Sequence, residues 1–132
     1  MTMLSIQYRM NPQISLFPSR RFYGGKLGDA PNIAKDRVIE WHSKFPAFQF
    51  FTTSGGGGEV RNKLQSLSNM EEVRACAGLV RAFAENYPGI NFGHRIGIIT
   101  FYKDQVRKLR SEFRYLYGQS ILDFIDINTV FI

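Results

Sequence analysis

The sequence has little metal-binding or disulfide chemistry, with one cysteine and two histidines among its 132 residues. A lone Cys76 cannot form a disulfide within the chain, and it cannot supply the paired thiolates of a structural zinc site. His42 and His94 lie far apart, with no other metal ligand at a suitable spacing. The sequence therefore predicts no bound metal, and Cys76 is most simply a core residue.

Long apolar stretches are also missing. No run approaches the ~20 residues that cross a bilayer, and no charged flank with an apolar core marks a secretion signal. We therefore expect a soluble intracellular protein, nuclear or cytoplasmic, that has no membrane partner.

The phosphate-binding loop of nucleotide hydrolases is missing as well. That loop places Gly-Lys-Ser/Thr at the start of a helix, so that backbone amides cradle phosphates and the hydroxyl reaches magnesium. Lys63 is instead followed by Leu64, and the residue directly before it is not glycine. The glycine run at residues 55–58 is therefore interpreted as a linker.

The chain has an excess of positive charge. It contains 17 Lys and Arg and 11 Asp and Glu, which gives a net charge of +6. Such a balance favours anionic partners such as nucleic acid or nucleotide. A solvated basic surface is the plain alternative, and charge alone does not decide between them. A chain of 132 residues with 44% hydrophobic residues can form one domain with a core.

The first part of the chain predicts fewer regular elements than the rest. Residues 12–23 predict a helix with an aromatic end, and residues 34–43 predict a surface excursion around Trp41. Residues 48–53 are aromatic and β-branched, which predicts a strand. A helix should follow, capped by Ser68 or Asn69, with Glu71 or Glu72 completing a capping box. Its apolar stripe comprises Val73, Cys76, Val80 and Phe83, and Pro88-Gly89 ends it.

The second part alternates between strand and helix patterns. Residues 96–100 form an apolar run, which predicts a central strand buried on both faces. A second helix begins near Lys103 and ends at Gly118, with an apolar face of Val106, Leu109, Phe113 and Leu116. Residues 121–127 predict another strand. This alternation predicts an α/β fold with a parallel sheet covered by helices.

Several short motifs follow one another along the chain. The first is Gln7-Tyr-Arg-Met-Asn-Pro12, followed by Phe17-Pro-Ser19 and Phe22-Tyr-Gly24, and further motifs occupy residues 69–73, 96–106 and 126–130. In this order and spacing, they resemble the motifs of the second RecA-like motor domain of superfamily-one helicases, in the branch with senataxin and the nonsense-mediated-decay helicase. The chain departs from that pattern at Asn11, where the family usually has His, and at Phe101, where it commonly has Pro.

The resemblance implies a RecA-like three-layer α/β domain that is incomplete at its C-terminus. It would span residues 1–132, with the first motif and the excursion in residues 1–46 and the alternating core in residues 47–132. The implied function is the C-terminal half of an ATP-dependent RNA or DNA helicase, whose preceding RecA-like domain holds ATP and Mg²⁺. We expect this chain alone to bind neither and to be inactive. The likeness to senataxin slightly favours the nucleus.

The family motif at residues 126–130 normally continues into an Asp-Gly-Phe-Gln-Gly segment, whereas Phe131 and Ile132 follow here. This difference leads us to expect a truncated motor. Two alternatives stay open, namely a non-catalytic basic module that binds nucleic acid and an inactive product of a truncated gene.

The resemblance assigns the nucleotide contacts to Gln7, Tyr8 and Arg9. Arg9 is predicted to be an arginine finger, because a guanidinium can stabilise charge on a transferred phosphoryl group without giving up a proton. Tyr8 offers a flat ring for the base of the nucleotide. A surface ion pair and a half-buried ring are the plain alternatives for an isolated Tyr-Arg pair.

Contacts to single-stranded RNA or DNA are assigned to Thr100, Tyr102 and Thr129. Polar groups at the ends of parallel strands face the crevice where ligands of α/β sheets bind, and in this family such threonines are expected to hold phosphates. Strand propensity is an equal explanation for Thr100. The basic face of the second helix, made by Lys103, Arg107, Lys108, Arg110 and Arg114, predicts either a path for nucleic acid or simply a solvated surface.

Overall fold

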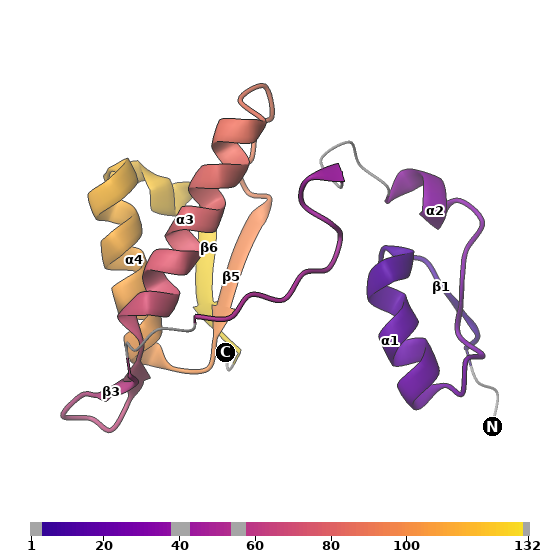
Figure 1. The fold of residues 1–132 in the computed structure, drawn as a ribbon, viewed down its shortest axis with the longest axis horizontal. Coiled ribbons are helices and arrows are strands. Elements are labelled where there is room, and N and C mark those ends of the chain that lie inside the picture. The colour runs from indigo at the N-terminus through magenta and orange to yellow at the C-terminus, as the bar shows by residue number, and fades with distance from the viewer. Residues whose placement is uncertain (1–3, 38–42, 54–57, 131–132) are drawn as a thin grey trace. The chain divides into compact units, whose positions relative to one another are not determined.

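The computed structural model describes residues 4–37, 43–53 and 58–130 (Figure 1). They belong to two compact units, Met1–Phe51 and Thr52–Ile132, which are described separately below. Trp41, His42 and residues 54–57 lie outside the described residues. The centre of the surface excursion and most of the glycine linker therefore remain predictions.

The first unit is built around a short parallel strand pair. Strand β1 (Ile6–Gln7) pairs with β2 (Gly28–Asp29), helix α1 (Pro12–Phe22) lies between them in the chain, and α2 (Ile33–Asp36) follows. The side chain of Asn11 accepts a hydrogen bond from the Gln13 amide at 2.8 Å, which caps α1. The helix expected at residues 12–23 is confirmed.

Serine hydroxyls attach α1 to the rest of its unit. Ser15 Oγ donates to Asp29 Oδ1 at 2.7 Å, and Ser19 Oγ donates to the Leu27 carbonyl at 2.7 Å. Both serines are buried, whereas Leu16 and Phe17 on other faces of the helix are exposed. Polar contacts rather than an apolar stripe therefore hold α1 in place.

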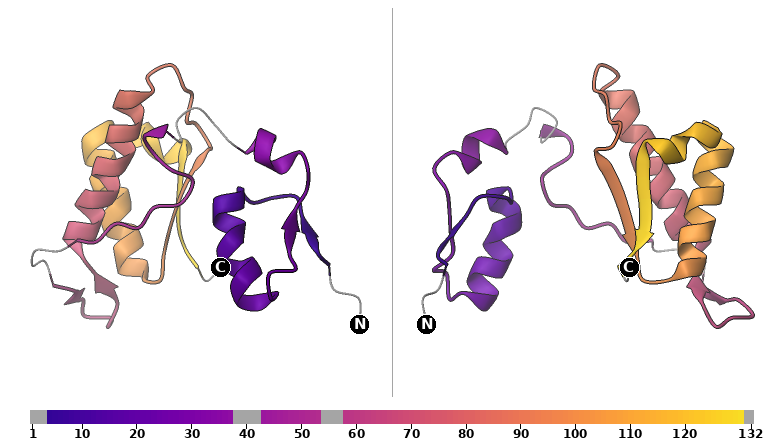
Figure 2. Two further views of the ribbon diagram at one scale, coloured as in Figure 1. Left: turned by 45° about the vertical axis from the view of Figure 1, so that its right-hand side comes forward. Right: turned by 180° about the vertical axis from the view of Figure 1, so that it is seen from behind.

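The second unit contains a parallel strand pair with two long helices on one side. Strand β5 (Ile96–Thr100) pairs with β6 (Ile125–Thr129) in parallel along their full length. Helices α3 (Met70–Asn86) and α4 (Lys103–Tyr117) lie on the same side of this pair (Figures 1 and 2). Their shared core comprises Val73, Ala77, Val106, Leu109, Phe113, Ile125 and Ile127. Helices packed on parallel strands confirm the α/β class and form part of a RecA-like fold.

The strand predicted at residues 48–53 is wrong. These residues adopt no regular structure, and Phe48 and Phe50 are largely exposed. Aromatic residues favour strands chiefly because they pack against cross-strand neighbours. No strand pairs with this segment within the described part of the chain, so its composition alone does not make it a strand.

The burial predicted for β5 is also wrong. Ile96 and Ile98 pack against the core, but Ile99 points to the opposite face and is 71% exposed. Side chains alternate along a strand. Within residues 58–130, helices cover only one face of the β5–β6 pair, so every second residue of β5 stays exposed.

The last strand begins later than predicted. Residues 121–123 belong to η2 (Gln119–Asp123), a 3₁₀ helix, and β6 starts only at Ile125. Gly118, with φ of +87°, ends α4 as predicted. Helix η2 connects the end of α4 to β6. Its apolar residues resemble a strand in sequence, because periodicity does not distinguish a short apolar run in a strand from one in a helix.

Candidate nucleotide and nucleic-acid site

The side-chain amide of Gln7 is fully engaged by the protein. Its Oε1 accepts hydrogen bonds from the backbone amides of Arg9 at 2.8 Å and Met10 at 2.7 Å. Its Nε2 donates to the Met10 carbonyl at 2.8 Å and to Asp29 Oδ1 at 2.6 Å. A carboxamide has two donor hydrogens and two acceptor lone pairs, so this inventory is complete. Gln7, which is buried, therefore fixes the backbone turn that carries Tyr8 and Arg9.

The two side chains on that turn are directed away from their own unit. Tyr8 is 66% exposed, and Arg9 is exposed as well. Gln7 and Asp29 are register partners in the β1–β2 pair, so the turn directly follows a hydrogen-bonded strand. A fixed backbone with exposed side chains is the arrangement that a residue needs to reach a ligand held elsewhere.

Residues outside the first motif also support this turn. Asp29 accepts from both Gln7 and Ser15, and thus joins the turn to α1. Asn11 Nδ2 donates to the Arg37 carbonyl at 2.8 Å, which links the start of α1 to the end of α2. Asn11 thus forms capping bonds where the family usually has His. Sequence reasoning missed Asp29 and Ser15, because no local pattern relates them to Gln7.

Thr100 and Thr129 are brought together at the ends of β5 and β6. They are register partners, and the Val130 amide donates to the Thr100 carbonyl at 3.1 Å. Both are partly exposed at the carboxyl edge of the strand pair, where polar groups of parallel sheets meet ligands. The structure thus unites two of the three residues that the sequence assigned to single strands. Tyr102, 42% exposed, follows as the N-cap residue of α4.

A small hollow of about 180 Å³ adjoins Thr100 and Tyr102. Its other lining residues are Glu59, Leu67, Ser68, Asn69, Glu72, Phe101 and Gln105. Carboxylates of Glu59 and Glu72 on its wall disfavour a phosphate inside the hollow itself. A strand contacting Thr100 would therefore follow the exposed edge of the sheet.

Gln105 is a second buried amide that sequence reasoning missed. Its Oε1 accepts from the Asn69 amide at 2.8 Å, and its Nε2 donates to the Asn69 carbonyl at 3.2 Å and to the Glu72 carboxylate at 3.1 Å. Asn69 caps α3 as predicted, by accepting from the amides of Glu71 and Glu72. The reciprocal part of the capping box is wrong, because Gln105 takes the Asn69 amide. A buried glutamine thereby joins the start of α4 to the start of α3.

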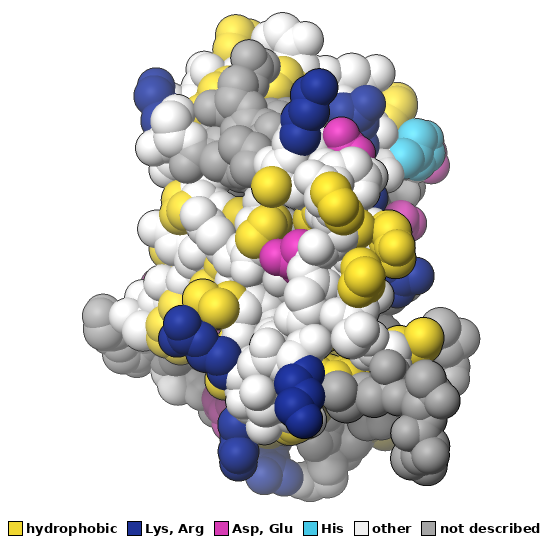
Figure 3. All heavy atoms as spheres, turned by 90° about the vertical axis from the view of Figure 1, so that its right-hand side faces the viewer, with side chains coloured by type: hydrophobic (Ala, Val, Ile, Leu, Met, Phe, Trp, Pro, Cys, Tyr) yellow, Lys and Arg dark blue, Asp and Glu magenta, His cyan; other side chains and the backbone are white. Residues whose placement is uncertain are grey.

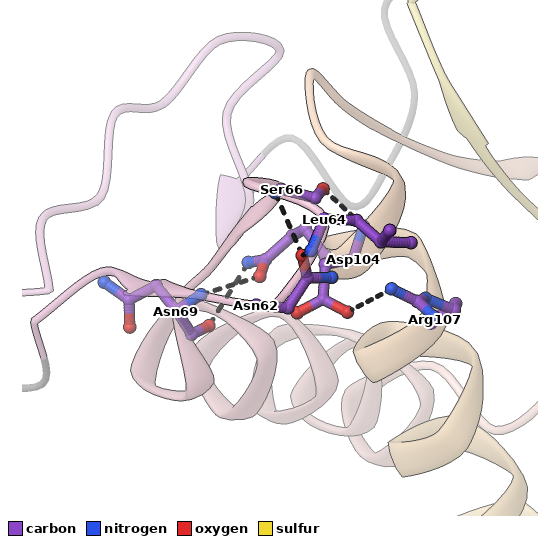
Figure 4. A network of polar contacts seen from close by, with 7 residues as sticks. Asn62, Leu64, Ser66, Asn69, Asp104 and Arg107 are labelled. Atoms are coloured by element: carbon purple, nitrogen blue, oxygen red, sulfur yellow. Dashed lines mark hydrogen bonds and ion pairs between the residues drawn. The ribbon is translucent and has the colours of Figure 1, made fainter.

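Asp104 organises the loop that leads into α4 (Figure 4). Strands β3 (Val60–Arg61) and β4 (Leu67–Ser68) form an antiparallel hairpin, and the Asp104 amide donates to Ser66 Oγ at the hairpin's loop. The Ser68 hydroxyl lowers the pKa of the Asp104 carboxyl most, and Asn62 and Arg107 lower it further. Arg107 Nη2 lies 2.7 Å from Asp104 Oδ1. The ionised carboxylate thus holds the hairpin against α4.

The basic face of α4 is partly used within the protein. Arg107 pairs with Asp104, and Arg110 Nη2 donates to the Ile127 carbonyl at 2.8 Å. These contacts favour the structural explanation for two of the five cations. Figure 3 looks at another part of the chain, the first unit, where Lys and Arg side chains lie among hydrophobic ones.

The described part of the chain has neither a metal-ligand cluster nor a membrane-spanning helix. No three His, Cys, Asp or Glu side chains among those residues cluster as a metal site would require. No described helix has both the length and the apolar character to cross a bilayer. Cys76 packs against the core as predicted, and burial raises the pKa of its thiol.

Comparisons with known proteins identify the family. A family model described as an AAA domain matches residues 1–131. The chain belongs to this family. It is 41% identical over 132 residues to Helicase sen1 of Schizosaccharomyces pombe, covering 98% of this chain and 8% of that protein. It is 30% identical over 129 residues to Probable helicase senataxin of Mus musculus, covering 93% of this chain and 5% of that protein.

A third relative belongs to the other named group of the branch. Regulator of nonsense transcripts 1 of Dictyostelium discoideum is 36% identical over 110 residues, which cover 77% of this chain and 8% of that protein. These matches confirm the resemblance to the superfamily-one branch that contains senataxin and the nonsense-mediated-decay helicase. The chain spans less than a tenth of the length of the three relatives.

Proposed function

We propose that this chain is part of the second motor domain of an ATP-dependent RNA or DNA helicase. In this proposal residues 1–132 form a partial RecA-like domain, which supplies Arg9 and Tyr8 to ATP held with Mg²⁺ by a preceding RecA-like domain. The observation that best supports it is the Gln7 amide, which fixes the backbone of Arg9 and Met10 while the Tyr8 and Arg9 side chains remain exposed.

Arg9 has the chemistry of an arginine finger. Phosphoryl transfer spreads negative charge over the transferred group, and a planar guanidinium can donate two parallel hydrogen bonds to it. A guanidinium needs no proton transfer to act on a phosphoryl group. An exposed side chain on a fixed turn can reach a nucleotide bound on another domain with little loss of backbone freedom.

Tyr8 would contribute affinity rather than rate. Its exposed ring can stack on the base of the nucleotide, and this contact is the same before and during phosphoryl transfer. Gln7 would act on nucleotide binding through the turn, because its four hydrogen-bonding positions are taken by Arg9, Met10 and Asp29.

Thr100, Tyr102 and Thr129 would contact the single strand. The threonine hydroxyls can donate to backbone phosphates, which positions the strand without reading its sequence. Tyr102 offers a partly exposed ring on which a base can stack. Because Thr100 and Thr129 are register partners, the two contacts would lie next to each other on the sheet edge.

Joining this chain to the ATP-holding RecA-like domain of a related helicase tests the proposal. The fusion, extended with the family's Asp-Gly-Phe-Gln-Gly segment, should hydrolyse ATP when single-stranded RNA or DNA is added. Neither half alone should do so, because Arg9 without a phosphate cradle has no charge to stabilise. Turnover by the purified chain alone would contradict the proposal. Single-strand binding that ignores nucleotide in the fusion would favour a non-catalytic basic module.

A further inference from the structure

Helix α1 has the reverse of the usual amphipathic arrangement. Surface helices normally bury an apolar stripe and expose polar side chains. Here Ser15 and Ser19 are buried, whereas Phe17 is 68% exposed. The serine hydroxyls attach α1 to Asp29 and Leu27, whereas most of the Phe17 side chain faces solvent.

Two arginines flank the exposed ring. Arg20 and Arg21 follow Phe17 by three and four residues, so all three lie on one side of the helix. Together with Gln13 and Leu16 they line an open hollow of about 440 Å³. We call these five residues the α1 outer face. The Phe17 ring is also supported by Phe22, whose centroid lies 6.3 Å away in an edge-to-face arrangement.

Charge around the α1 outer face is strongly positive. Residues 4–37 contain six Lys and Arg but only two carboxylates, Asp29 and Asp36, and neither belongs to α1. Asp29 accepts from Gln7 and Ser15, and Asp36 accepts from Asn32 Nδ2 at 2.9 Å. The helix therefore presents an aromatic ring and two cations with no carboxylate of its own to neutralise them.

The size of the α1 outer face argues against a stable protein partner. An 11-residue helix is only about 16 Å long, whereas a specific protein interface buries roughly 800 Å² on each partner. A single strand needs less area, because each nucleotide supplies one stacking base and one phosphate. Aromatic rings beside Arg and Lys are the usual components of surfaces that bind single strands without sequence preference.

We propose that the α1 outer face is a further binding site for single-stranded nucleic acid, separate from Thr100, Tyr102 and Thr129. In it Phe17 stacks on a base, while Arg20 and Arg21 contact neighbouring phosphates. The proposal does not depend on nucleotide hydrolysis by Arg9. It predicts that this chain binds a single strand by itself, without ATP and without the ATP-holding RecA-like domain.

Fluorescence anisotropy with a labelled single-stranded oligouridine tests this site. Phe17→Ala should weaken binding about 5-fold to 150-fold, which corresponds to about 1–3 kcal/mol for one stacked base. Phe17→Tyr keeps a flat ring and should retain the affinity. Because the side chains of Phe17, Arg20 and Arg21 are exposed, the circular dichroism of each variant at these positions should match that of the parent chain.

The arginines are tested through salt dependence. Each phosphate contact to a single strand contributes about −0.7 to the slope of log affinity against log salt. Arg20→Gln with Arg21→Gln should therefore make the slope shallower by about 1.4. The matched control is Lys26→Gln with Lys35→Gln, which removes the same charge from exposed positions outside α1 and should leave most of the slope.

Two results would overturn the site. One is an affinity for oligouridine that is the same in the Phe17→Ala chain as in the parent. This holds also if sedimentation shows that Phe17→Ala changes self-association of the chain. The other is an equal loss of slope in the arginine pair and the lysine pair, since general charge would then explain the binding.

Discussion

Gln7 Nε2 donates a 2.6 Å hydrogen bond to the carboxylate of Asp29, which lies 22 residues further along the chain. The same glutamine accepts from the amides of Arg9 and Met10. One side chain therefore connects the strand pair β1–β2 to the turn that carries the proposed arginine finger. The position of Arg9 depends on a contact that no local sequence pattern contains.

We predict that Gln7→Ala loosens this turn. The amides of Arg9 and Met10 would lose their acceptor, and leaving such partly buried donors without a partner costs about 1–3 kcal/mol. Hydrogen exchange of these two amides, followed by NMR, should become faster by about fivefold or more, whereas Gln13→Ala on the exposed face of α1 should change little. Unchanged protection of both amides in Gln7→Ala would show that other contacts fix the turn.

Gln105→Ala should destabilise the second unit. The change leaves the partly buried Asn69 amide without its acceptor, at a cost of about 1–3 kcal/mol in the free energy of unfolding. Urea denaturation measures this loss, with Gln119→Ala at an exposed position of η2 as the control. If the urea midpoint of Gln105→Ala differs from that of the parent by no more than the midpoint of Gln119→Ala does, the Gln105 link between α3 and α4 does not stabilise the second unit.

Asp104 should make stability depend on pH. Its pKa is lowered in the folded state, chiefly by the Ser68 hydroxyl, and then by Asn62 and Arg107. A carboxyl with a lowered folded pKa stabilises the protein at pH values above its unfolded pKa of about 3.9, and this stabilisation is lost as pH falls through the folded pKa. The parent should therefore be more stable than Asp104→Asn near neutral pH.

Urea midpoints of the parent and Asp104→Asn should begin to converge as the pH falls below about 4, where the unfolded chain takes up a proton, and should meet once the pH has passed through the lowered folded pKa of Asp104. Arg107→Gln should show a smaller parent-to-variant difference, since Arg107 is not the main cause of the shift. A difference between parent and Asp104→Asn that stays constant from neutral to acid pH would contradict the role of the ionised carboxylate.

Binding of a single strand should depend on the paired threonines. Thr100→Val and Thr129→Val keep the β-branched shape, and each removes a hydroxyl that can donate to a phosphate. Loss of a hydrogen bond to a charged group is worth about 1.5–3 kcal/mol, so affinity should fall roughly tenfold or more. Thr52→Val, at an exposed site outside the strands, is the matched control in an anisotropy assay.

The same assay at two salt concentrations checks the electrostatic part of binding. Affinity should fall steeply as salt rises, because each phosphate contact releases counterions. Salt-independent binding, or the absence of binding at low salt, would contradict contacts to phosphates at Thr100 and Thr129.

Long periodic segments were predictable from the sequence, whereas partners distant in the chain were not. The apolar stripe through Val73 and the one through Phe113 predicted α3 and α4, since helical periodicity is a local property. The strand predicted at residues 48–53 failed because strand formation needs a neighbour that the pattern does not reveal. Register between Thr100 and Thr129 likewise follows from tertiary pairing, so only their positions at strand ends could be foreseen.

The candidate nucleotide site shows the same division. The first motif predicts roles for Tyr8 and Arg9, which stay predictions, whereas the hydrogen bonds by which Gln7 fixes the turn involve Asp29 and the backbone of the turn. Gln105 lies within another recognised motif, yet its partner Asn69 is 36 residues away. Buried amides of this kind have no periodicity, so sequence patterns do not reveal which groups they satisfy.

Steady-state ATPase kinetics of the fused motor, with saturating single strand, test the central role of Arg9 most directly. Arg9→Ala should lower kcat and kcat/KM together by on the order of a thousandfold or more, and Arg9→Lys should not restore them. Tyr8→Ala should instead raise KM with kcat nearly unchanged, and Arg37→Ala serves as an exposed-arginine control. Near-normal kcat in Arg9→Ala, or the opposite pattern in the Tyr8 and Arg9 variants, would contradict the assigned roles.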